Sequence, residues 1–359
     1  MAQGIRTKAD IKSMNLVQLE AFVQGLGEPK FRAKQIFGWL HQKQVTSFEE
    51  MTNLSKEFRA KLIDEAKIGT LRLVRRLVSQ EDETRKYLFA LENDSIIESV
   101  FMKYEHGNTV CISTQAGCRM GCKFCASTIG GVERNLTAGE MLSQVYEIQR
   151  DCGEHIRGVV LMGSGEPLDN YEQVMKFLEL IHAPDGQNMG HRHITLSTCG
   201  LIERIYELAR EELQITLAVS LHAPNDDIRR QTMPVAMANP MEKLLKACAD
   251  YITITNRRIT FEYAMIHGVN DSDACAKELA KKLKRMLCHV NLIPMNEVDE
   301  WAYSKSSNER VKQFAKILQT NGVETTIRRK LGGDIHAACG QLRRSHLNRE
   351  VDDIKDVNV

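Results

Sequence analysis

The stretch Gly117-Cys118-Arg119-Met120-Gly121-Cys122-Lys123-Phe124-Cys125 brings three cysteines together with the spacing C-x3-C-x2-C. Three thiolates at this spacing can bind one iron–sulfur cube or form part of a zinc site. Structural zinc normally takes two ligand pairs of the C-x2-C type, and the sequence holds no second pair. A four-iron cluster ordinarily takes four cysteines, so three leave one iron open to a substrate or cofactor. We therefore predict that Cys118, Cys122 and Cys125 bind a four-iron, four-sulfur (4Fe-4S) cluster.

Short β-rich runs alternate with helix-length segments from about residue 107 onward. The predicted strands are 110–114, 159–162, 194–198, 215–221, 259–266, 290–294 and 325–329, and the predicted helices are 137–150, 171–182, 201–211, 241–252, 273–286 and 307–320. This alternation implies βαβ units and a mostly parallel sheet, so the fold class is α/β. Many units in series favour a full or partial barrel, with a doubly wound sheet as the alternative. In both folds ligands bind at the C-terminal ends of the strands.

The sequence pattern of the first hundred residues indicates a separate domain. Residues 31–42 show a helical spacing of apolar side chains, Ser47-x-x-Glu50 is a capping box, and Ser55 can cap a second helix through Ala66. Residues 86–91 and 95–103 predict a β-hairpin. We therefore divide the chain into a helical accessory domain with a β-hairpin (1–103), a core with a C-terminal segment (104–346) and a polar tail (347–359).

The charge balance and the ten cysteines limit the class of protein. Among 359 residues, 48 Lys and Arg nearly balance 47 Asp and Glu, giving a formal net charge of +1. This balance excludes a globally basic nucleic-acid coat but leaves room for a local basic patch. The start of the chain, Met1–Asp10, is polar, and no run reaches the roughly 18 to 20 apolar residues of a membrane span. We expect a cytoplasmic protein with no membrane contact, whose reduced cysteines bind metal or take part in chemistry.

Small polar and acidic residues follow several of the other predicted strands. They are Gly163-Ser164-Gly165-Glu166-Pro167 after the second strand, Ser197 in the third, Ser220-Leu221-His222 at the fourth and Asn296 after the sixth. A carboxylate at a strand end suits a cationic amine, and small polar side chains suit ribose and carboxylate contacts. Taken alone, Glu166 is equally compatible with an exposed turn, and His222 is more typical of a hydrogen-bonded core histidine.

The cysteine spacing resembles that of the radical S-adenosylmethionine family. In that family the open iron is chelated by the amine and carboxylate of S-adenosylmethionine, and one electron from the cluster cleaves the sulfonium to a 5′-deoxyadenosyl radical. The resemblance implies a partial (β/α)6-type barrel. It also implies cofactor contacts from Gly165 and Glu166 to the methionine amine, and from Ser197, Ser220, Leu221, His222 and Asn296 to the rest of the molecule.

Two further cysteines narrow the resemblance. Cys111 lies inside the first predicted strand, and Cys339 lies in Ala337-Ala338-Cys339-Gly340-Gln341-Leu342. With the cysteine triad, Gly-Glu-Pro at 165–167 and Ser-Leu-His-Ala-Pro at 220–224, this set is similar to the bacterial 23S ribosomal RNA adenine-C2 methyltransferases, over essentially the whole chain. One local departure is His336, where we expect aspartate in many relatives.

This resemblance implies a radical methyl transfer that uses two molecules of S-adenosylmethionine per turnover. Adenine C2 is an electron-poor carbon that does not attack a methyl sulfonium as an amine does. In the family, Cys339 first takes a methyl group, and the radical made from the second molecule abstracts a hydrogen from it. The methylene radical adds to C2, and Cys111 then attacks Cys339 to form a transient disulfide and release the base. Glu98 matches the family's proton acceptor, and whether Glu98 or Cys111 removes the C2 proton stays open.

Local basic charge supports an RNA substrate. Nine basic residues lie between Ser304 and His346 against three acidic ones, a net charge of +6 around Cys339: Lys305, Arg310, Lys312, Lys316, Arg328, Arg329, Lys330, Arg343 and Arg344. A basic rim binds phosphates, and a target base must leave its stack to reach the cluster. The resemblance implies 23S rRNA and tRNA as substrates and a one-electron reductant of the flavodoxin or ferredoxin type. We expect a monomer, with a second RNA contact from the N-terminal domain.

Two alternatives share much of this pattern. A C8-specific 23S rRNA adenine methyltransferase that confers antibiotic resistance has all of these motifs, although Cys-Gly-Gln-Leu-Arg-Arg at 339–344 favours the C2 enzyme. A non-catalytic iron–sulfur RNA-binding or redox-sensor protein would have no need of Cys339. The other five cysteines stand singly and receive no function, since a free cysteine is often simply buried.

Overall fold

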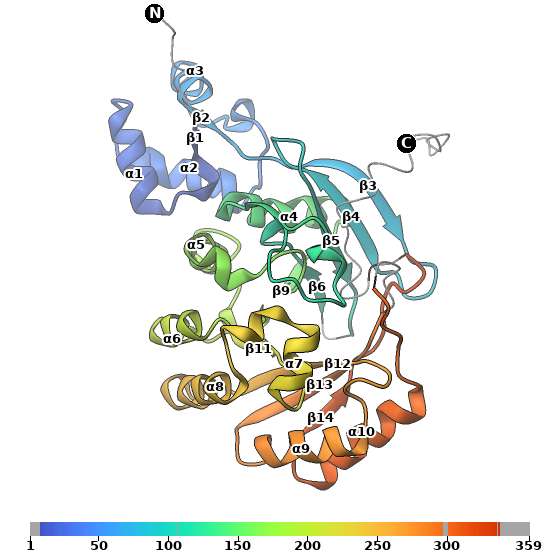
Figure 1. The fold of residues 1–359 in the computed structure, drawn as a ribbon. Helices are drawn as coiled ribbons and strands as arrows, with labels where there is room; N and C mark the ends of the chain where they lie inside the picture. The colour runs from blue at the N-terminus through green and yellow to red at the C-terminus, as the bar shows by residue number, and fades with distance from the viewer. Residues whose placement is uncertain (1–7, 106, 297–300, 336, 338–359) are drawn as a thin grey trace, which may run out of the picture.

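The computed structural model describes residues 8–105, 107–296, 301–335 and 337, and the statements below refer to these residues. Their centre is a ten-stranded sheet with the strand order β14-β13-β12-β11-β10-β9-β6-β5-β4-β3 (Figure 1). The parallel strands are β6 (Asn108–Cys111), β9 (Ile156–Leu161), β10 (Ile194–Thr198), β11 (Thr216–Ser220), β12 (Ile259–Met265), β13 (Cys288–Pro294) and β14 (Thr325–Ile327). The order is linear, with β3 and β14 at its edges, which confirms the α/β class and favours a partial barrel over a closed one.

Helices connect the parallel strands, because parallel neighbours need a crossover. They are α4 (Ala138–Cys152), α5 (Tyr171–His182), α6 (Ile202–Arg210), α7 (Asp226–Thr232), α8 (Met241–Thr255), α9 (Asp273–Leu283) and α10 (Asn308–Thr320) (Figure 1). Local signals fix several starts: Thr137 and Glu140 form a capping box on α4, and Ser272 and Ser307 cap α9 and α10. Every strand and helix predicted after residue 107 is present, with ends shifted by a few residues; α7 was not predicted.

The N-terminal part is helical, as predicted. It contains α1 (Leu16–Gly25), α2 (Phe31–His41) and α3 (Lys56–Glu65), and β1 (Ala9–Asp10) pairs with β2 (Ala66–Lys67). The capping box of Ser47 and Glu50 and the cap at Ser55 are both confirmed.

Short 3-10 helices are found along the described part of the chain. They are η1 (Ile11–Ser13), η2 (Phe48–Glu50), η3 (Ala126–Thr128), η4 (Pro167–Asn170), η5 (His191–His193) and η6 (Pro234–Met237). Within the described ranges, no helix is long and apolar enough to cross a membrane.

The predicted hairpin is part of the central sheet. Its strands are β4 (Arg85–Ala90) and β5 (Ile96–Met102), and β5 pairs antiparallel with β6. A further strand, β3 (Arg72–Val78), pairs with β4 and forms the sheet edge. The hairpin therefore continues the core sheet directly, while the division of the chain at residue 103 stays a prediction.

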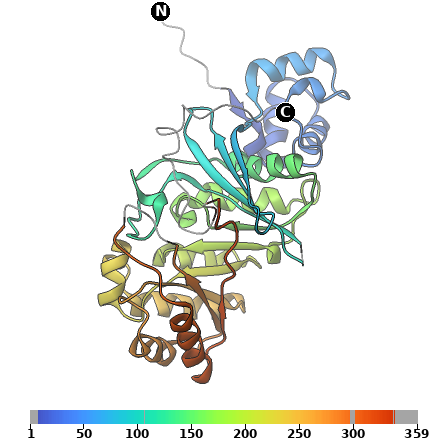
Figure 2. The same ribbon diagram turned by 90° about the vertical axis from the view of Figure 1, so that its right-hand side faces the viewer.

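The N-terminal helices pack on α4, as Figure 2 shows for the blue and green helices. Lys12 is buried and donates from Nζ to the Ser143 hydroxyl (2.9 Å), and the Gly139 N–H donates to the Ser13 hydroxyl (2.8 Å). A Cβ on Gly139 would lie only 2.8 Å from that hydroxyl, so glycine permits the close approach. The buried His41 ring contacts the Tyr146 hydroxyl (3.1 Å) in the same interface. These contacts fasten the N-terminal helices to the core.

The cysteine loop is bracketed by a small two-stranded sheet. Strands β7 (Gln115–Gly117) and β8 (Val132–Asn135) pair antiparallel, and the Cys118 N–H donates to the Gly131 carbonyl (3.0 Å). Gly117 has a φ of 78°, and a Cβ there would lie 2.1 Å from the same carbonyl. Glycine is therefore required at the position where the chain enters the loop.

Candidate active site

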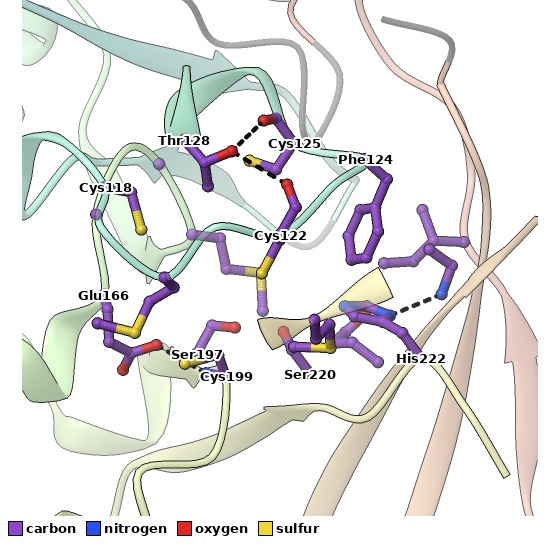
Figure 3. Close-up of a pocket in the computed structure, with 18 of the residues that line it drawn as sticks. Cys118, Cys122, Phe124, Cys125, Thr128, Glu166, Ser197, Cys199, Ser220 and His222 are labelled. Carbon is purple, nitrogen blue, oxygen red and sulfur yellow. Dashed lines mark hydrogen bonds between the residues drawn. The ribbon is translucent and has the colours of Figure 1, made fainter. Parts of the chain in front are cut away.

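A cavity opens where the cysteine loop meets the C-terminal ends of the parallel strands. Residues of the cysteine loop and of several strand ends line it together (Figure 3). Nine of the residues selected from the sequence line it: Cys118, Cys122, Cys125, Gly165, Glu166, Ser197, Ser220, His222 and Asn296. Leu221 does not line the cavity but is fully buried in the main apolar core beside it. The fold thus gathers residues from five separate strand ends around one space.

The three cysteines come from one loop, across the cavity from Glu166 and Ser197 (Figure 3). The Thr128 hydroxyl donates to the carbonyls of Cys122 (3.1 Å) and Cys125 (2.9 Å), which fixes the loop. Burial raises the pKa of the Cys118 thiol to about 12, so it stays protonated until a metal binds. No three His, Cys, Asp or Glu side chains in the described part of the chain are grouped to hold a single metal ion. Three soft thiols that attach to different irons of a cube need not converge on one point, so the donor set fits an iron–sulfur cluster.

Glu166 is buried and held from both carboxylate oxygens. Oε1 accepts from the Leu168 N–H (3.0 Å) and Oε2 from the Cys199 N–H (2.7 Å). Burial raises the pKa of this carboxyl, while the hydrogen bonds from Cys199 and Leu168 oppose that shift. Gly165 has a φ of 105°, and a Cβ there would lie 2.7 Å from the Gln115 nitrogen. The chain therefore presents an oriented acidic group at the second strand end, which suits a cationic amine.

His222 is a neutral, fixed imidazole in the cavity wall. Its Nδ1 accepts from the Ala264 N–H (2.8 Å), so the ring proton is on Nε2 (Figure 3). Burial lowers its pKa to about 3, and its edge-on contact with Phe124 has a centroid separation of 5.0 Å. The ring therefore offers one N–H donor and no charge at the fourth strand end.

The sequence reading missed several residues of the cavity wall. Glu262 on β12 is buried, and its Oε2 accepts from Asn291 Nδ2 (2.9 Å) and lies 4.0 Å from Arg328 Nη1. Burial raises the pKa of Glu262, and Arg328 opposes the shift. The sequence does contain a signal for Glu262, because it is an acidic residue inside the apolar run 259–266. The cavity also has thioether groups, from Met120, Met162, Met233 and Met295.

Glu98 and Cys111 lie on adjacent strands next to this cavity. In the β5–β6 register Val100 is opposite Cys111, so Glu98, two residues before Val100, projects from the same face as Cys111. Glu98 is 2% exposed and forms an ion pair with the equally buried Lys86 (3.2 Å). Cys111 therefore shares one face of the sheet with a buried carboxylate on β5 and a buried ammonium on β4.

Cys111 belongs to a small apolar cluster that reaches the end of the described chain. The cluster contains Val100, Met102, Cys111, Leu331 and Ala337. A second hollow lies beside it, lined by Tyr104, Arg328, Arg329, Lys330 and Ala337, and it shares Ile293, Asn296 and Arg328 with the main cavity. Cys339, His336, Arg343 and Arg344 lie outside the described residues.

Comparisons with known proteins agree with this architecture. Residues 9–68 match the family described as the ribosomal RNA large subunit methyltransferase N-terminal domain, and residues 112–279 match the radical SAM superfamily. The chain is 55% identical over 338 residues to the probable dual-specificity RNA methyltransferase RlmN of Caldanaerobacter subterraneus, covering 94% of this chain and 98% of that one. It is 52% identical to the RlmN protein of Alkaliphilus metalliredigens, covering 98% and 99%. The chain belongs to the RlmN family.

A solved structure extends the comparison. A radical SAM methyltransferase from Sphaerobacter thermophilus superposes with a TM-score of 0.90 at 44% identity, covering 94% of this chain and 99% of that one. The protein is therefore a methyltransferase of the radical SAM superfamily, with a 4Fe-4S cluster and S-adenosylmethionine as cofactors. Membership in this enzyme family excludes the alternative that the chain is a non-catalytic iron–sulfur protein.

Proposed function

We propose that this protein methylates C2 of an adenine in 23S rRNA, and of an adenine in certain tRNAs, through a methylated Cys339. The observation that carries the proposal is that Cys111 and Ala337 share one buried cluster. Ala337 stands two residues before Cys339 in the sequence. A mechanism that uses two cysteines needs this C-terminal stretch close to Cys111, and the shared cluster supports that requirement as far as Ala337.

The cofactor residues prepare the chemistry. We assign Cys118, Cys122 and Cys125 to the cluster, Glu166 and Gly165 to the methionine amine, and Ser197, Ser220, His222 and Asn296 to other polar groups of S-adenosylmethionine, with Leu221 packing behind them. When bound, the cofactors supply a methyl group and a 5′-deoxyadenosyl radical. The apolar wall of methionines and Phe124 excludes water from this space.

The two thiols and one carboxylate carry the methyl group to the base. The Cys339 thiolate takes a methyl group by displacement, and the derived methylene radical forms a carbon–carbon bond to C2. Glu98, which forms an ion pair with Lys86, accepts the proton that C2 loses. The adduct also gives up its unpaired electron, which the cluster would accept. The Cys111 thiolate then attacks the Cys339 sulfur and a disulfide forms, while the electron pair of the broken carbon–sulfur bond stays on carbon, which takes a solvent proton to become the methyl group. An external reductant returns both thiols for the next turnover.

Basic side chains beside the cavity indicate where the RNA binds. Arg328, Arg329 and Lys330 line the second hollow together with Tyr104, where phosphates and a base can be held. The target adenine must leave its stack, so accessible RNA is the substrate. The N-terminal helices give a second RNA contact. We further propose a cytoplasmic monomer whose cluster would take single electrons from a flavodoxin- or ferredoxin-type protein, while thiol reductants of the cytoplasm reopen the disulfide by exchange.

Product analysis tests this function. The full chain is reconstituted without oxygen, given reductant, S-adenosylmethionine and ribosomal RNA or tRNA, and the nucleosides are resolved by mass spectrometry. We expect 2-methyladenosine together with 5′-deoxyadenosine. 8-Methyladenosine would assign the C8 activity instead, and no methylated adenosine from cluster-loaded protein would refute the proposal.

A further inference from the structure

Arg229 on α7 is a positive charge sealed inside the protein. Its side chain has 0% exposure, and it is the largest of the fully buried side chains. The guanidinium donates from Nη2 to the Cys199 carbonyl (2.7 Å) and from Nη1 to the Asn239 carbonyl (2.9 Å). Its Nε has no hydrogen-bond partner among the described residues. An arginine is always charged in proteins, and burying a charge is costly unless an opposite charge lies near it.

No carboxylate in the described part of the chain forms an ion pair with Arg229. Asp226, at the start of the same helix, pairs instead with Arg230 (3.9 Å) and accepts from the Met241 N–H (2.9 Å). Carbonyl acceptors alone do not need a full positive charge, because a neutral donor would satisfy them. Gly200, next to the Cys199 carbonyl, has a φ of 96°, and a Cβ there would lie 2.8 Å from Leu244 Cδ2 and 3.2 Å from Arg229 Nη2, so the guanidinium is tightly enclosed.

A hydrogen bond and a shared cavity wall connect the surroundings of Arg229 to the cysteine loop. The Lys123 N–H, between Cys122 and Cys125, donates to the carbonyl of Thr232 at the end of α7 (2.9 Å). Cys199, which accepts from Arg229 through its carbonyl, lines the cavity with Cys122. Burial lowers the pKa of Arg229, and Cys199, Asp226 and Cys122 act in the opposite direction, in that order of size. Arg229 thus senses charge at Cys122 of the cysteine loop as well as at Asp226 of its own helix.

We propose that Arg229 is the electrostatic counter-charge of the cluster and sets its reduction potential. A four-iron cluster with three thiolate ligands is an anion, and it gains one further negative charge when an external donor reduces it by one electron. A fixed cation in a low-dielectric interior stabilises the more negative state. Arg229 therefore acts as a positioning and tuning residue that touches no substrate. The inference rests on the three cysteines being the cluster ligands and not on the position methylated in RNA.

Potentiometry on matched variants tests this role. The reconstituted full-length protein is titrated without oxygen, and the reduced cluster is followed by electron paramagnetic resonance. Arg229→Gln should shift the midpoint potential to more negative values, and Arg229→Lys should keep it near wild type, because only the first removes the charge. Arg230→Gln removes an exposed charge from the same helix and should leave the potential unchanged.

The same variants separate tuning from a purely structural role. Both Arg229 variants lose the hydrogen bonds to Cys199 and Asn239, so both should unfold at lower temperature than wild type. A negative shift in Arg229→Gln alone supports the proposal. Equal potentials in all variants with full iron content, or equal shifts in Arg229→Gln and Arg229→Lys, would overturn it. Weaker S-adenosylmethionine binding with an unchanged potential would also overturn it, because Arg229 would then act on the cofactor.

Discussion

Cys111 and Ala337 pack in one buried cluster, although they come from the first parallel strand and from the end of the described chain. Ala337 precedes Cys339 by two residues in the sequence, so the cluster supports the proposed use of Cys111 together with Cys339. Glu98 and Lys86 lie on the same face of the neighbouring strands. The hairpin, which the sequence pattern assigned to the accessory domain, lines the second hollow with Val100 and Met102.

Replacing Cys111 should trap the covalent intermediate. In Cys111→Ala the radical still adds to the base, but no thiolate is present to break the carbon–sulfur bond. We expect a protein–RNA adduct that accumulates with each 5′-deoxyadenosine formed, visible on a denaturing gel and by mass spectrometry. Cys152→Ala is the matched control and should turn over normally, since Cys152 lies on α4 away from the cavity. Free methylated RNA from Cys111→Ala would show that Cys111 does not resolve the intermediate.

Removing the Glu98 carboxylate should separate the two halves of the reaction. Methylation of Cys339 needs no proton acceptor at C2, whereas release of the base does. Glu98→Gln should therefore still gain one methyl group on the protein while RNA methylation falls by about 100-fold or more, the usual effect of losing a general base. Intact-protein mass and nucleoside analysis measure the two steps. Full RNA turnover in this variant would assign the proton transfer to another group.

The Lys86–Glu98 pair should also matter for stability. Lys86→Met leaves a buried carboxylate without its cation, which costs about 3–5 kcal/mol in comparable sites. Adding Glu98→Gln should restore most of that loss, because no buried charge then remains. Urea unfolding of the two single variants and the double variant gives the coupling energy. Additive losses would mean that the two side chains do not stabilise each other.

Glycine at position 117 should be needed for cluster assembly. In Gly117→Ala the new Cβ would meet the Gly131 carbonyl at 2.1 Å, directly before Cys118. Iron and sulfide bound per chain should fall sharply. Gly130→Ala is a control with a similar positive φ of 87° but open space around the Cβ, so it isolates the collision from backbone strain. Equal iron content in both variants would contradict the assigned role of the close approach.

Two buried histidines should make the folded state sensitive to mild acid. Burial lowers the pKa of His41 and of His222 to about 3, below the value of about 6.5 in the unfolded chain. The unfolded state therefore binds more protons, and stability present above about pH 6.5 is lost as the pH falls toward 3. His41→Phe should reduce the slope of the unfolding free energy against pH between about 6.5 and 5. An unchanged slope would mean that His41 takes up its proton without unfolding.

Much of this fold could be predicted because local signals agree with the packing. The spans 171–182 and 194–198 match α5 and β10 as found, since one has helical periodicity and the other is a short β-rich run. Strand β3 was missed because its sequence RLVRRLV has no regular alternation and is mostly exposed. Helix α7 is short, and its buried Arg229 contradicts the usual expectation for a basic residue.

The site was predictable where parallel strand ends converge, and not where contacts depend on tertiary packing. Glu166, Ser197 and Ser220 follow successive strands, so the topology brings them together without further information. The ion pair of Lys86 with Glu98 depends on the β4–β5 register, which no local pattern specifies. Leu221 was grouped with the cofactor residues by its motif, yet its side chain packs in the core.

The central claim is that the methyl carbon passes through Cys339 as a methylene radical. Its most direct test uses S-adenosylmethionine with a trideuterated methyl group, over several turnovers, followed by mass analysis of both products. Our account predicts that the methyl group of the modified adenosine keeps two deuterium atoms and that 5′-deoxyadenosine gains one. A methyl group that keeps all three deuterium atoms would mean direct transfer and would contradict it.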